Sequence, residues 1–433
     1  FRYADPDYQK FLKRQITQVY NLLLGRGELI THMELGTLFY VRAADLYLKL
    51  GGTIAFVLPR AIFTADQHDD FRRGKFTSTS AKVGIKEVWD LEEVEPLFNV
   101  PACVVFGEKE KNPDISYPLP SETLRGVLPR RNASHAEASA SLVASNDQLF
   151  LSQVGKRSFW STTKGLQAKE ASYYKKHFRQ GATIVPRALW FVQVKASPLG
   201  FNPSLPPLET AERAKKHAKA PYKGLALKGN VESRFLYATL LSTDLLPFGD
   251  LGYRLVVLPI EPSGTGYTLV TEREARNRGV YGLAGWLEKA QAEWEERRGA
   301  KAKSMNIYER LDRVHGLTAQ NPQAKYRVLY PMSATYLCAC VVENRSIAFD
   351  ISGQKVQTNG FVVDYVTYYF ETNTEDEAYY LAATLNAPII DRLIKPMQAR
   401  GLWGPRHICK KVLELPIPRF DSSAEAHLKP CYS

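Results

Sequence analysis

The first 110 residues alternate between helical and strand-like patterns of apolar positions. Apolar residues recur at helical spacing up to Gly25 and again from about Met33 to Leu50. Thr53–Leu58 then carries apolar residues on both faces, as a central strand of an α/β sheet does. A helix over Ala65–Arg73 and strands over 85–89 and 100–106 follow. The pattern predicts an α/β domain, the closing half of a doubly wound, Rossmann-like sheet, over residues 1–110.

The rest of the chain predicts a second domain of another class. Residues 111–150 are polar, with several prolines and serines, and we expect a linker or an extended arm there. Residues 151–433 read as short strands, a long helical segment and a late strand–helix unit, which is typical of an α+β domain. The helical segment at about 272–314 is expected to connect the two halves of this domain.

Length and composition narrow the class of protein. The 433 residues suffice for two or three domains, and no run of 18 apolar residues predicts a membrane span. Five scattered cysteines favour a reducing, cytoplasmic setting over a disulfide framework. Cys338 and Cys340 lack zinc-ligand spacing, so we expect no metal. Because the first residue is Phe1, we expect the chain to begin inside a longer protein.

Positive charge is concentrated in one fifth of the chain. Residues 151–230 hold 15 Lys and Arg against 3 Asp and Glu, a difference equal to the whole net charge of +12. Aromatic residues interleave with them. Basic side chains release counterions from phosphate backbones, and flat rings stack on bases. The segment therefore favours nucleic-acid binding, with a solvated basic face over an aromatic core as the alternative.

Two long stretches resemble a known family. THMELGTLFYVRAADLYLKLGGTIAFVLPRAIF and WDLEEVEPLFNVPACVVFGEK are similar to the later part of the catalytic domain of adenine-N6 DNA methyltransferases of the TaqI-like, or "N-6 DNA methylase", type. The run VVDYVTYYFETNTEDEAYYLAATLNAPIIDRLIKPMQARGLWGPRHICKKVLELPIPRF resembles the target recognition domain of that family, and half of a type I restriction specificity subunit.

The resemblance implies an activity and its partners. Such enzymes transfer a methyl group from S-adenosylmethionine to N6 of an adenine flipped out of double-stranded DNA, in restriction–modification or other phage-defence systems. The partners implied are double-stranded DNA and a nuclease or another defence-system subunit, with no membrane, in the cytoplasm of a bacterium or archaeon.

The resemblance also implies roles for three residues. Thr53–Leu58 corresponds to the fifth strand of the cofactor-binding sheet, which places Pro59 and Arg60 at the rim of the catalytic cleft. Phe98 corresponds to the aromatic residue that stacks on the flipped adenine, because a flipped base needs an apolar surface to rest on. The alternatives are that Pro59 merely ends a strand, that Arg60 is solvated and that Phe98 belongs to the core.

Two hallmarks of the family are missing from these residues. The catalytic Asn/Asp-Pro-Pro-aromatic has no match, because Leu205-Pro206-Pro207-Leu208 lacks both the polar head and the aromatic. The Gly-rich S-adenosylmethionine loop is also missing, and Ser263-Gly264-Thr265-Gly266 is typical of a hairpin turn. We expect both features upstream of Phe1, so that the chain holds no catalytic residue and is inactive alone.

Candidate DNA-contacting residues come from the basic segment. The run Gln180–Arg187 resembles the start of the recognition domain in related enzymes, and Arg187 could read a guanine edge. The other basic candidates are expected to contact phosphates. The candidates are Lys156, Arg157, Lys175, Lys176, Arg179, Arg187, Lys223 and Lys228.

Two further hypotheses stay open at this point. A non-catalytic, sequence-specific DNA-binding specificity module would bind duplex DNA without any dependence on S-adenosylmethionine. An RNA-directed protein is compatible with the basic, aromatic-rich segment. Competition between duplex DNA and structured RNA separates these two.

Overall fold

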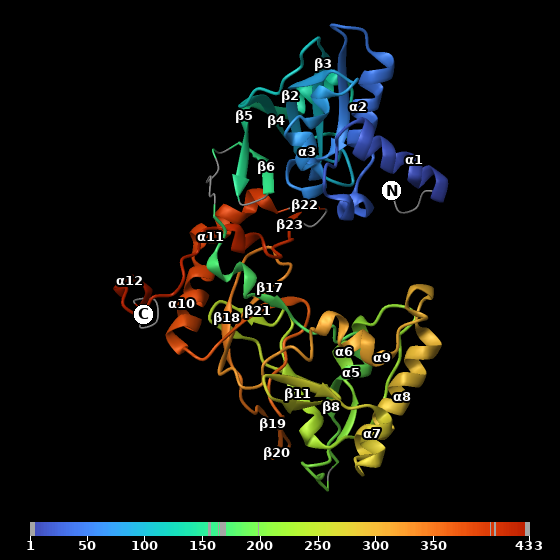
Figure 1. Cartoon of the computed structure of the whole chain (residues 1–433), viewed down its shortest axis with the longest axis vertical. Helices are drawn as coiled ribbons and strands as arrows, with labels where there is room; N and C mark the ends of the chain where they lie inside the picture. Colours follow the sequence, from blue (N-terminus) through green and yellow to red (C-terminus); the bar gives the residue numbers. More distant parts are fainter. Residues whose placement is uncertain are drawn as a thin grey trace. The chain divides into compact units, whose positions relative to one another are not determined.

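The computed structural model describes residues 5–154, 157–162, 164, 170–197, 199–398, 400–401 and 404–428. The chain forms two compact units: unit 1 is Phe1–Ser172 with Pro388–Ile417, and unit 2 is Tyr173–Ala387 with Pro418–Ser433 (Figure 1). These boundaries differ from the predicted ones. Unit 2 begins at Tyr173 instead of residue 151, and a late segment of the chain returns to unit 1.

Unit 1 is built on a six-stranded mixed sheet, in the order β1-β3-β2-β4-β5-β6. β3 is antiparallel to both β1 and β2, so β1 and β2 run in the same direction, and β4 is parallel to β2. The mixed α/β class is confirmed. That this sheet is the closing half of a doubly wound sheet stays a prediction. The strands are β1 (Thr53–Pro59), β2 (Val83–Glu95), β3 (Ala102–Lys109), β4 (Leu119–Val127), β5 (Leu142–Val154) and β6 (Arg157–Ser161).

The predicted linker at 111–150 is wrong, because β4 and most of β5 lie in it and extend the sheet. In β4 the burial of the side chains alternates, as in a strand with one buried face. Leu119, Ser121 and Thr123 are buried, whereas the residues between them are not. The sequence pattern did not show this strand, because small polar residues occupy its buried face and prolines flank it. Ser121 can be buried because its hydroxyl donates a hydrogen bond to the Val88 carbonyl.

One end of the unit 1 sheet is open. β1 is the end strand and pairs only with β3 among the described residues. Helix α2 (Gly36–Tyr47) packs on β1 through an apolar core, yet Val57 of β1 remains 53% exposed. Phe39, Leu46 and Tyr47 of α2 are exposed as well. A free strand edge beside exposed apolar side chains is a surface that can accept another strand.

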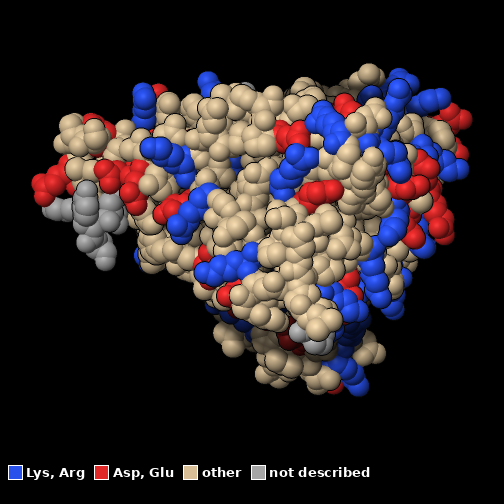
Figure 2. All heavy atoms as spheres, turned by 90° about the horizontal axis from the view of Figure 1, so that it is seen from below, with Lys and Arg blue, Asp and Glu red and all other residues tan. Residues whose placement is uncertain are grey.

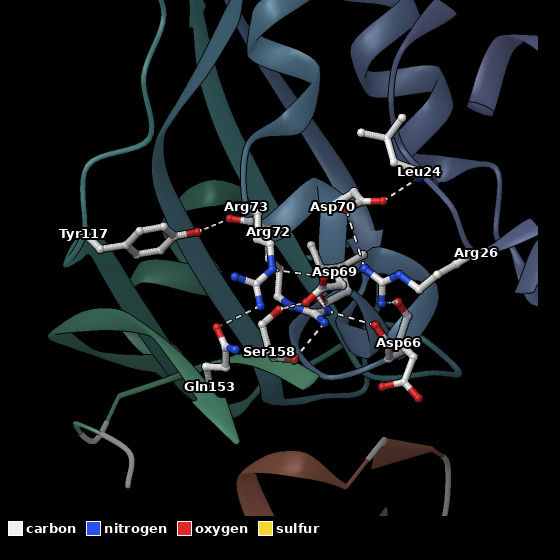
Figure 3. Close-up of polar contacts among 12 residues, drawn as sticks. Leu24, Arg26, Asp66, Asp69, Asp70, Arg72, Arg73, Tyr117, Gln153 and Ser158 are labelled. Atoms are coloured by element: carbon white, nitrogen blue, oxygen red, sulfur yellow. Dashed lines mark hydrogen bonds and ion pairs between the residues drawn. The ribbon is translucent and has the colours of Figure 1, made fainter. Parts of the chain in front are cut away.

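A buried network of charged groups lies inside unit 1 (Figure 3). The side chain of Arg72 has no exposed surface and donates to the carbonyl oxygens of Ile62 (2.6 Å), Ala65 (3.0 Å) and Ser158 (2.8 Å). Asp69, beside it on α3 (Asp69–Arg72), accepts from Ser158, Arg26 and Arg73. Each guanidinium nitrogen of Arg72 and each carboxylate oxygen of Asp69 thus has a partner, and the network ties α3 to β6.

The late segment completes the same unit. Backbone N–H of Ser172 donates to the Leu413 carbonyl (3.1 Å), and Glu414 lies 3.5 Å from Arg157 of β6. Three further helices or strand pairs of unit 1 are α4 (His135–Ser141), α11 (Pro388–Ile394) and β22/β23 (Arg400–Gly401, Gly404–Pro405), while α1 (Pro6–Arg14) opens the chain.

Unit 2 contains two antiparallel sheets with helices packed around them. One sheet has the order β10-β9-β8-β14-β11 and the other β18-β17-β21-β7. The strands are β7 (Arg179–Gln180), β8 (Phe191–Val194), β9 (Pro207–Thr210), β10 (Lys228–Asn230), β11 (Leu236–Thr239), β14 (Arg254–Val257), β17 (Tyr326–Pro331), β18 (Cys340–Glu343) and β21 (Thr367–Thr372). Three two-stranded hairpins add β12/β13 (Leu245–Leu246, Gly249–Asp250), β15/β16 (Ile260–Ser263, Gly266–Leu269) and β19/β20 (Ala348–Ile351, Gln354–Gln357).

The helices of unit 2 include the predicted connector, which is broken. Helix α7 (Glu272–Asn277) is followed closely by Gly279, which lies in the left-handed region (φ +71°), and α8 (Tyr281–Arg297) ends before Gly299. Trp286 and Leu287 of α8 are buried in the main core together with Trp190. The other helices are α5 (Arg187–Trp190), α6 (Glu212–His217), α9 (Ile307–Leu311), α10 (Glu375–Asn386) and α12 (Glu425–Leu428).

Two features are absent from the described residues. No helix there combines the length and the hydropathy that crossing a membrane requires. In the same part of the chain, no three His, Cys, Asp or Glu side chains gather as a metal site would need.

Candidate nucleic-acid interface

The carboxyl ends of β1, β2 and β4 share one edge of the unit 1 sheet, which we call the carboxyl edge. Pro59 ends β1 and pairs with Ala102 of β3, and the N–H of Arg60 donates to the Pro101 carbonyl (2.9 Å). The loop that holds Phe98 joins β2 to β3 at this same edge. In open α/β sheets ligands bind at the carboxyl ends of the strands, so this edge is the first candidate site.

Arg60 is engaged inside the protein at this edge. Its guanidinium donates to both carboxylate oxygens of Asp90 (2.9 and 2.8 Å) and lies 3.1 Å from Glu92. It also covers the ring of Phe63, at 4.5 Å from the centroid. DNA would have to compete with two carboxylates for this side chain. The predicted role of Pro59 and Arg60 at a cleft rim therefore stays a prediction.

Phe98 is 47% exposed in the loop between β2 and β3. Its neighbour Asn99 accepts a hydrogen bond from Arg131 (2.6 Å), and the N–H of Leu128 donates to the Glu95 carbonyl (2.6 Å). These bonds tie the loop to the chain that leaves β4. An exposed ring on a tethered loop can offer a face to a planar ligand. The alternative of a core phenylalanine does not agree with this exposure, while the stacking role itself remains untested.

A second candidate site lies in unit 2. A groove of about 1160 Å³, which we call the unit 2 groove, is lined by residues of α5, β8, α6, the loop 218–222, the segment 241–255, β19 and Tyr365. Its apolar lining includes Phe191, Val192 and Leu255. Arg213, His217 and Lys219 add a basic wall. Lys and Arg side chains stand among larger uncharged areas on the face drawn in Figure 2.

Arg187 lies in this groove at the start of α5. Its guanidinium is 5.6 Å from the centroid of Phe191 and 3.5 Å from the carboxylate of Asp364. Arg187 Nε and Asp364 Oδ2 are buried without a hydrogen-bond partner. Burial raises the pKa of Asp364 to about 6, although Arg187 opposes the shift. Incompletely satisfied polar atoms of this kind mark a place where a polar ligand can bind.

Another arginine of the groove is fully paired. Arg254 donates to both carboxylate oxygens of Asp244 (2.6 Å each), and Asp244 also accepts from the N–H of Leu241 (2.8 Å). This arrangement neutralises Arg254 and fixes the two ends of the segment 244–254. The charge available to a ligand therefore comes from Arg187 and from the α6 side of the groove.

The predicted DNA-contacting residues are divided between the two units. Lys156 lies outside the described residues. Arg157 belongs to unit 1 and is 2.9 Å from Asp66. Lys175 and Lys176 end a 3-10 turn, and Arg179 of β7 donates to the Ala319 carbonyl (3.2 Å). Lys223 follows Tyr222, which lines the groove, and Lys228 is exposed on β10. Of the candidates that the structure describes, only Arg187 lines the groove, and the DNA-binding roles stay predictions.

Sequence reasoning missed several groove residues. The run AERAKKHAKAPYK at 211–223 carries Arg213, His217 and Lys219, and its density of basic residues was a usable signal. Tyr222 holds a buried hydroxyl without a partner. The sequence around Asp364 and Arg254 did not indicate a site, because each residue reaches the groove only through contacts with residues distant in the sequence.

Comparison with known proteins gives matches of fold only. No protein-family model and no curated protein matches the chain. Its structure is similar to that of the Type IIL restriction-modification enzyme MmeI in complex with DNA, with a TM-score of 0.51 and 10% identity, over 95% of this chain and 44% of that one. At this identity the similarity concerns the fold.

Two weaker matches are of related kinds. The type IIG restriction endonuclease BpuSI gives a TM-score of 0.26 at 12% identity, over 99% of this chain and 47% of that one. The ATP-dependent Type ISP restriction-modification enzyme LlaBIII bound to DNA gives 0.35 at 8% identity, over 99% and 28%. Scores below 0.5 do not establish a shared fold. The chain spans less than half the length of each of these three proteins.

Proposed function

We propose that the chain is part of a site-specific DNA adenine-N6 methyltransferase of a restriction–modification or other phage-defence system. In this proposal unit 1 contributes the later strands of the catalytic domain, and unit 2 recognises the DNA sequence. The fold similarity to MmeI over 95% of the chain is the observation that carries it. Three features of the chain itself support it: the carboxyl edge with Phe98, the open edge of β1, and the unit 2 groove.

The strand arrangement supports a methyltransferase half. β1 and β2 run in the same direction with β3 inserted antiparallel between them, and β1 is the free end of the sheet. The earlier strands of a doubly wound sheet would pair with that free edge and cover Val57, Leu46 and Tyr47. The resemblance of the sequence around β1 agrees with this arrangement.

The residues present do not fit S-adenosylmethionine by themselves. At the carboxyl edge the acidic residues Asp90 and Glu92 are already paired with Arg60, so neither is free to accept from ribose hydroxyls. The sequence at this edge also lacks the Gly-rich S-adenosylmethionine loop of the family it resembles. In this proposal the cofactor loop and the catalytic tetrapeptide belong to a segment outside these 433 residues.

The chain's own residues would then have two roles. At the carboxyl edge, Phe98 offers its exposed ring to the flipped adenine and holds it out of the stacked duplex. In unit 2, Lys219 and Arg213 contact phosphates, which fixes the position of the duplex without reading its sequence. Arg187, with a buried Nε that lacks a partner, can donate to a guanine edge.

Duplex binding by the 433-residue chain is the first test. We expect fluorescence anisotropy to show binding to a labelled DNA duplex that weakens steeply with added salt, and structured RNA to compete poorly. Absence of duplex binding at low salt would overturn the proposal for unit 2. RNA that competes better than DNA would instead favour an RNA-directed protein.

Methyl transfer is the second test and addresses unit 1. The intact mass of the protein from its natural source shows whether it extends before Phe1. Transfer of labelled methyl groups to duplex DNA is then compared between that protein and its Phe98→Ala variant. We expect the variant to bind DNA normally and to lose about 5- to 150-fold in methylation, since a missing stacking face costs about 1–3 kcal/mol. Unchanged methylation would remove Phe98 from the site.

A non-catalytic specificity module remains the second candidate. The missing tetrapeptide and cofactor loop favour it as far as these 433 residues go. It requires duplex binding that S-adenosylmethionine does not affect and a natural protein that methylates no DNA. Equal binding with and without the cofactor, together with an inactive natural protein, would replace the enzyme with this module.

A further inference from the structure

A short hairpin beside the unit 2 groove presents apolar side chains to solvent. β12 and β13 pair through Leu245 with Asp250 and Leu246 with Gly249, and Pro247 and Phe248 form the turn. Leu246 is 41% exposed and Phe248 is 53% exposed. Leu251, which follows the hairpin and lines the groove, is 67% exposed. Three large apolar side chains within six residues have no core to pack in.

The hairpin is held rigidly at its base. Asp244 accepts from Arg254 on the other side of the hairpin, and its carbonyl accepts from the N–H of Leu251 (2.8 Å). The side chain of Leu245 points into a core cluster that includes Leu329. The N–H of Phe248 donates to the Ala339 carbonyl (2.8 Å). The exposed rings and methyl groups therefore stand on a fixed support.

The backbone at Phe248 is unfavourable for that residue. Its φ is +63°, in the left-handed region that glycine adopts at no steric cost. A bulky side chain at such a position marks a site where strain is maintained by the surroundings, and such sites cluster at ligand contacts. Packing does not explain the ring, since more than half of it is exposed. A contact with a ligand does.

The charge of the neighbouring groove indicates the kind of ligand. Leu251, Asp244 and Arg254 line the same groove as Arg213 and Lys219. Asp244 is neutralised by Arg254, and the remaining lining holds Arg213 and Lys219 against Glu212, so the net charge of these groups is positive. A polyanion that also offers flat apolar surfaces satisfies both features. Duplex DNA does so when an apolar side chain enters between two base pairs while basic side chains hold the phosphates.

We propose that the β12–β13 hairpin is a wedge that inserts Phe248, supported by Leu246, between base pairs of duplex DNA bound at the unit 2 groove. The proposal rests on the DNA binding proposed above and adds a deformation of the duplex. The inserted ring partly unstacks one base step and kinks the DNA there. Because no phosphate is contacted, the wedge adds affinity that does not depend on salt.

The test compares variants of the 433-residue chain on a short duplex of random sequence, labelled at both ends. Phe248→Gly removes the ring and relieves the backbone, so the variant should fold at least as stably as the wild type. We expect its duplex affinity to fall about tenfold with an unchanged salt slope, and energy transfer between the end labels to report a straighter duplex. Phe248→Trp should keep both affinity and bend.

The matched control is Tyr281→Ala, which removes an aromatic side chain of the same unit that is 69% exposed and lies outside the groove lining. It should bind and bend DNA as the wild type does. Equal affinity and equal bend for Phe248→Gly would overturn the wedge while leaving the proposed function intact. A wild-type chain that binds no duplex would overturn both. A Phe248→Gly chain that becomes monomeric from an oligomer, with DNA binding unchanged, would make the hairpin a protein interface.

Discussion

Two buried arginine–aspartate arrangements, one in each unit, differ in completeness. In unit 1, Arg72 and Asp69 lie in a network in which carbonyls, a hydroxyl and two further arginines engage every charged atom (Figure 3). In unit 2, Arg187 and Asp364 are 3.5 Å apart, and each keeps a buried atom without a partner. The first arrangement is closed to solvent, whereas Arg187 opens into a groove.

The difference separates a structural from a functional use of the same residue types. A satisfied buried network holds elements together, and removing one member leaves several groups unpaired. An incomplete pair costs stability for as long as it stays incomplete and can gain hydrogen bonds from a ligand. We therefore expect changes at Arg72 to affect folding, and changes at Arg187 to affect DNA binding.

The largest effect is expected for Arg72→Ala. Its loss removes this donor from the Ile62 and Ser158 carbonyls, leaves the Ala65 carbonyl with the N–H of His68 alone, and should destabilise unit 1 by about 3–5 kcal/mol. Hydrogen exchange of unit 1 peptides measures the change. Arg73→Ala is the control, since this side chain is partly exposed and Asp69 keeps Ser158 and Arg26 as donors, so the change should cost about 1 kcal/mol or less. Equal effects of the two variants would refute the distinction.

The next effect concerns pH and Asp364. Burial raises the pKa of its carboxyl from the ordinary value of 3.8 to about 6 in the folded protein, so between these pH values the folded state holds a proton that the unfolded state has lost. Stability of unit 2 therefore falls as pH rises from about 4 to above 6, by about 3 kcal/mol from this group. Asp364→Asn should remove that component. The measurement is denaturant unfolding of the wild type and of Asp364→Asn at a series of pH values. If the free energy of unfolding changes with pH equally in the two proteins, the prediction is wrong.

A smaller effect is expected at Arg187 and concerns DNA binding. Removing Arg187 alone strips Asp364 of its ion pair, so the substitution is made in the Asp364→Asn protein. We expect Arg187→Ala there to weaken binding to the preferred duplex about tenfold and to reduce discrimination between sequences. Arg187→Lys should not restore it, because an ammonium lacks the two-pronged donor geometry. If the substitution weakens binding equally for all duplex sequences, Arg187 contacts a phosphate and not a base.

The smallest effect is expected at Lys219. Its side chain is exposed on the basic side of the groove, and Lys219→Ala should weaken duplex binding evenly for every sequence. The slope of binding against salt should decrease by about one unit. Lys325→Ala, an exposed lysine outside the groove lining, is the control. A change in sequence preference at Lys219 would show that the groove reads bases where we expect phosphate contact.

Uninterrupted apolar strands were predictable from the sequence, and paired polar strands were not. β1 and β3 have apolar cores bounded by Gly52 and by Pro59 and Pro101, which define their ends. β4 escaped prediction because Ser121 and Thr123 occupy its buried face. Their hydrogen bonds to Val88 and Asp147 exist only in the folded sheet. A hydropathy pattern does not contain that information.

The candidate sites show the same limit. The exposure of Phe98 follows from a loop between two predicted strands, so the carboxyl edge was partly visible in the sequence. The unit 2 groove was not, because its lining comes from segments as far apart as Arg187 and Tyr365. Arg187 itself was predicted, but its partner Asp364 was identified only as a strand residue. Pairings over long sequence separations need the fold.

The return of residues 388–417 to unit 1 has a consequence for how the protein is made. Unit 1 depends on contacts such as Leu413 with Ser172 and Glu414 with Arg157, which form only after residues 173–387 have been synthesised. At about 5–20 residues per second, synthesis of residues 173–387 takes about 10–40 seconds. During that interval the nascent chain carries an unfinished unit 1, and unit 2, which includes Pro418–Ser433, is completed later still.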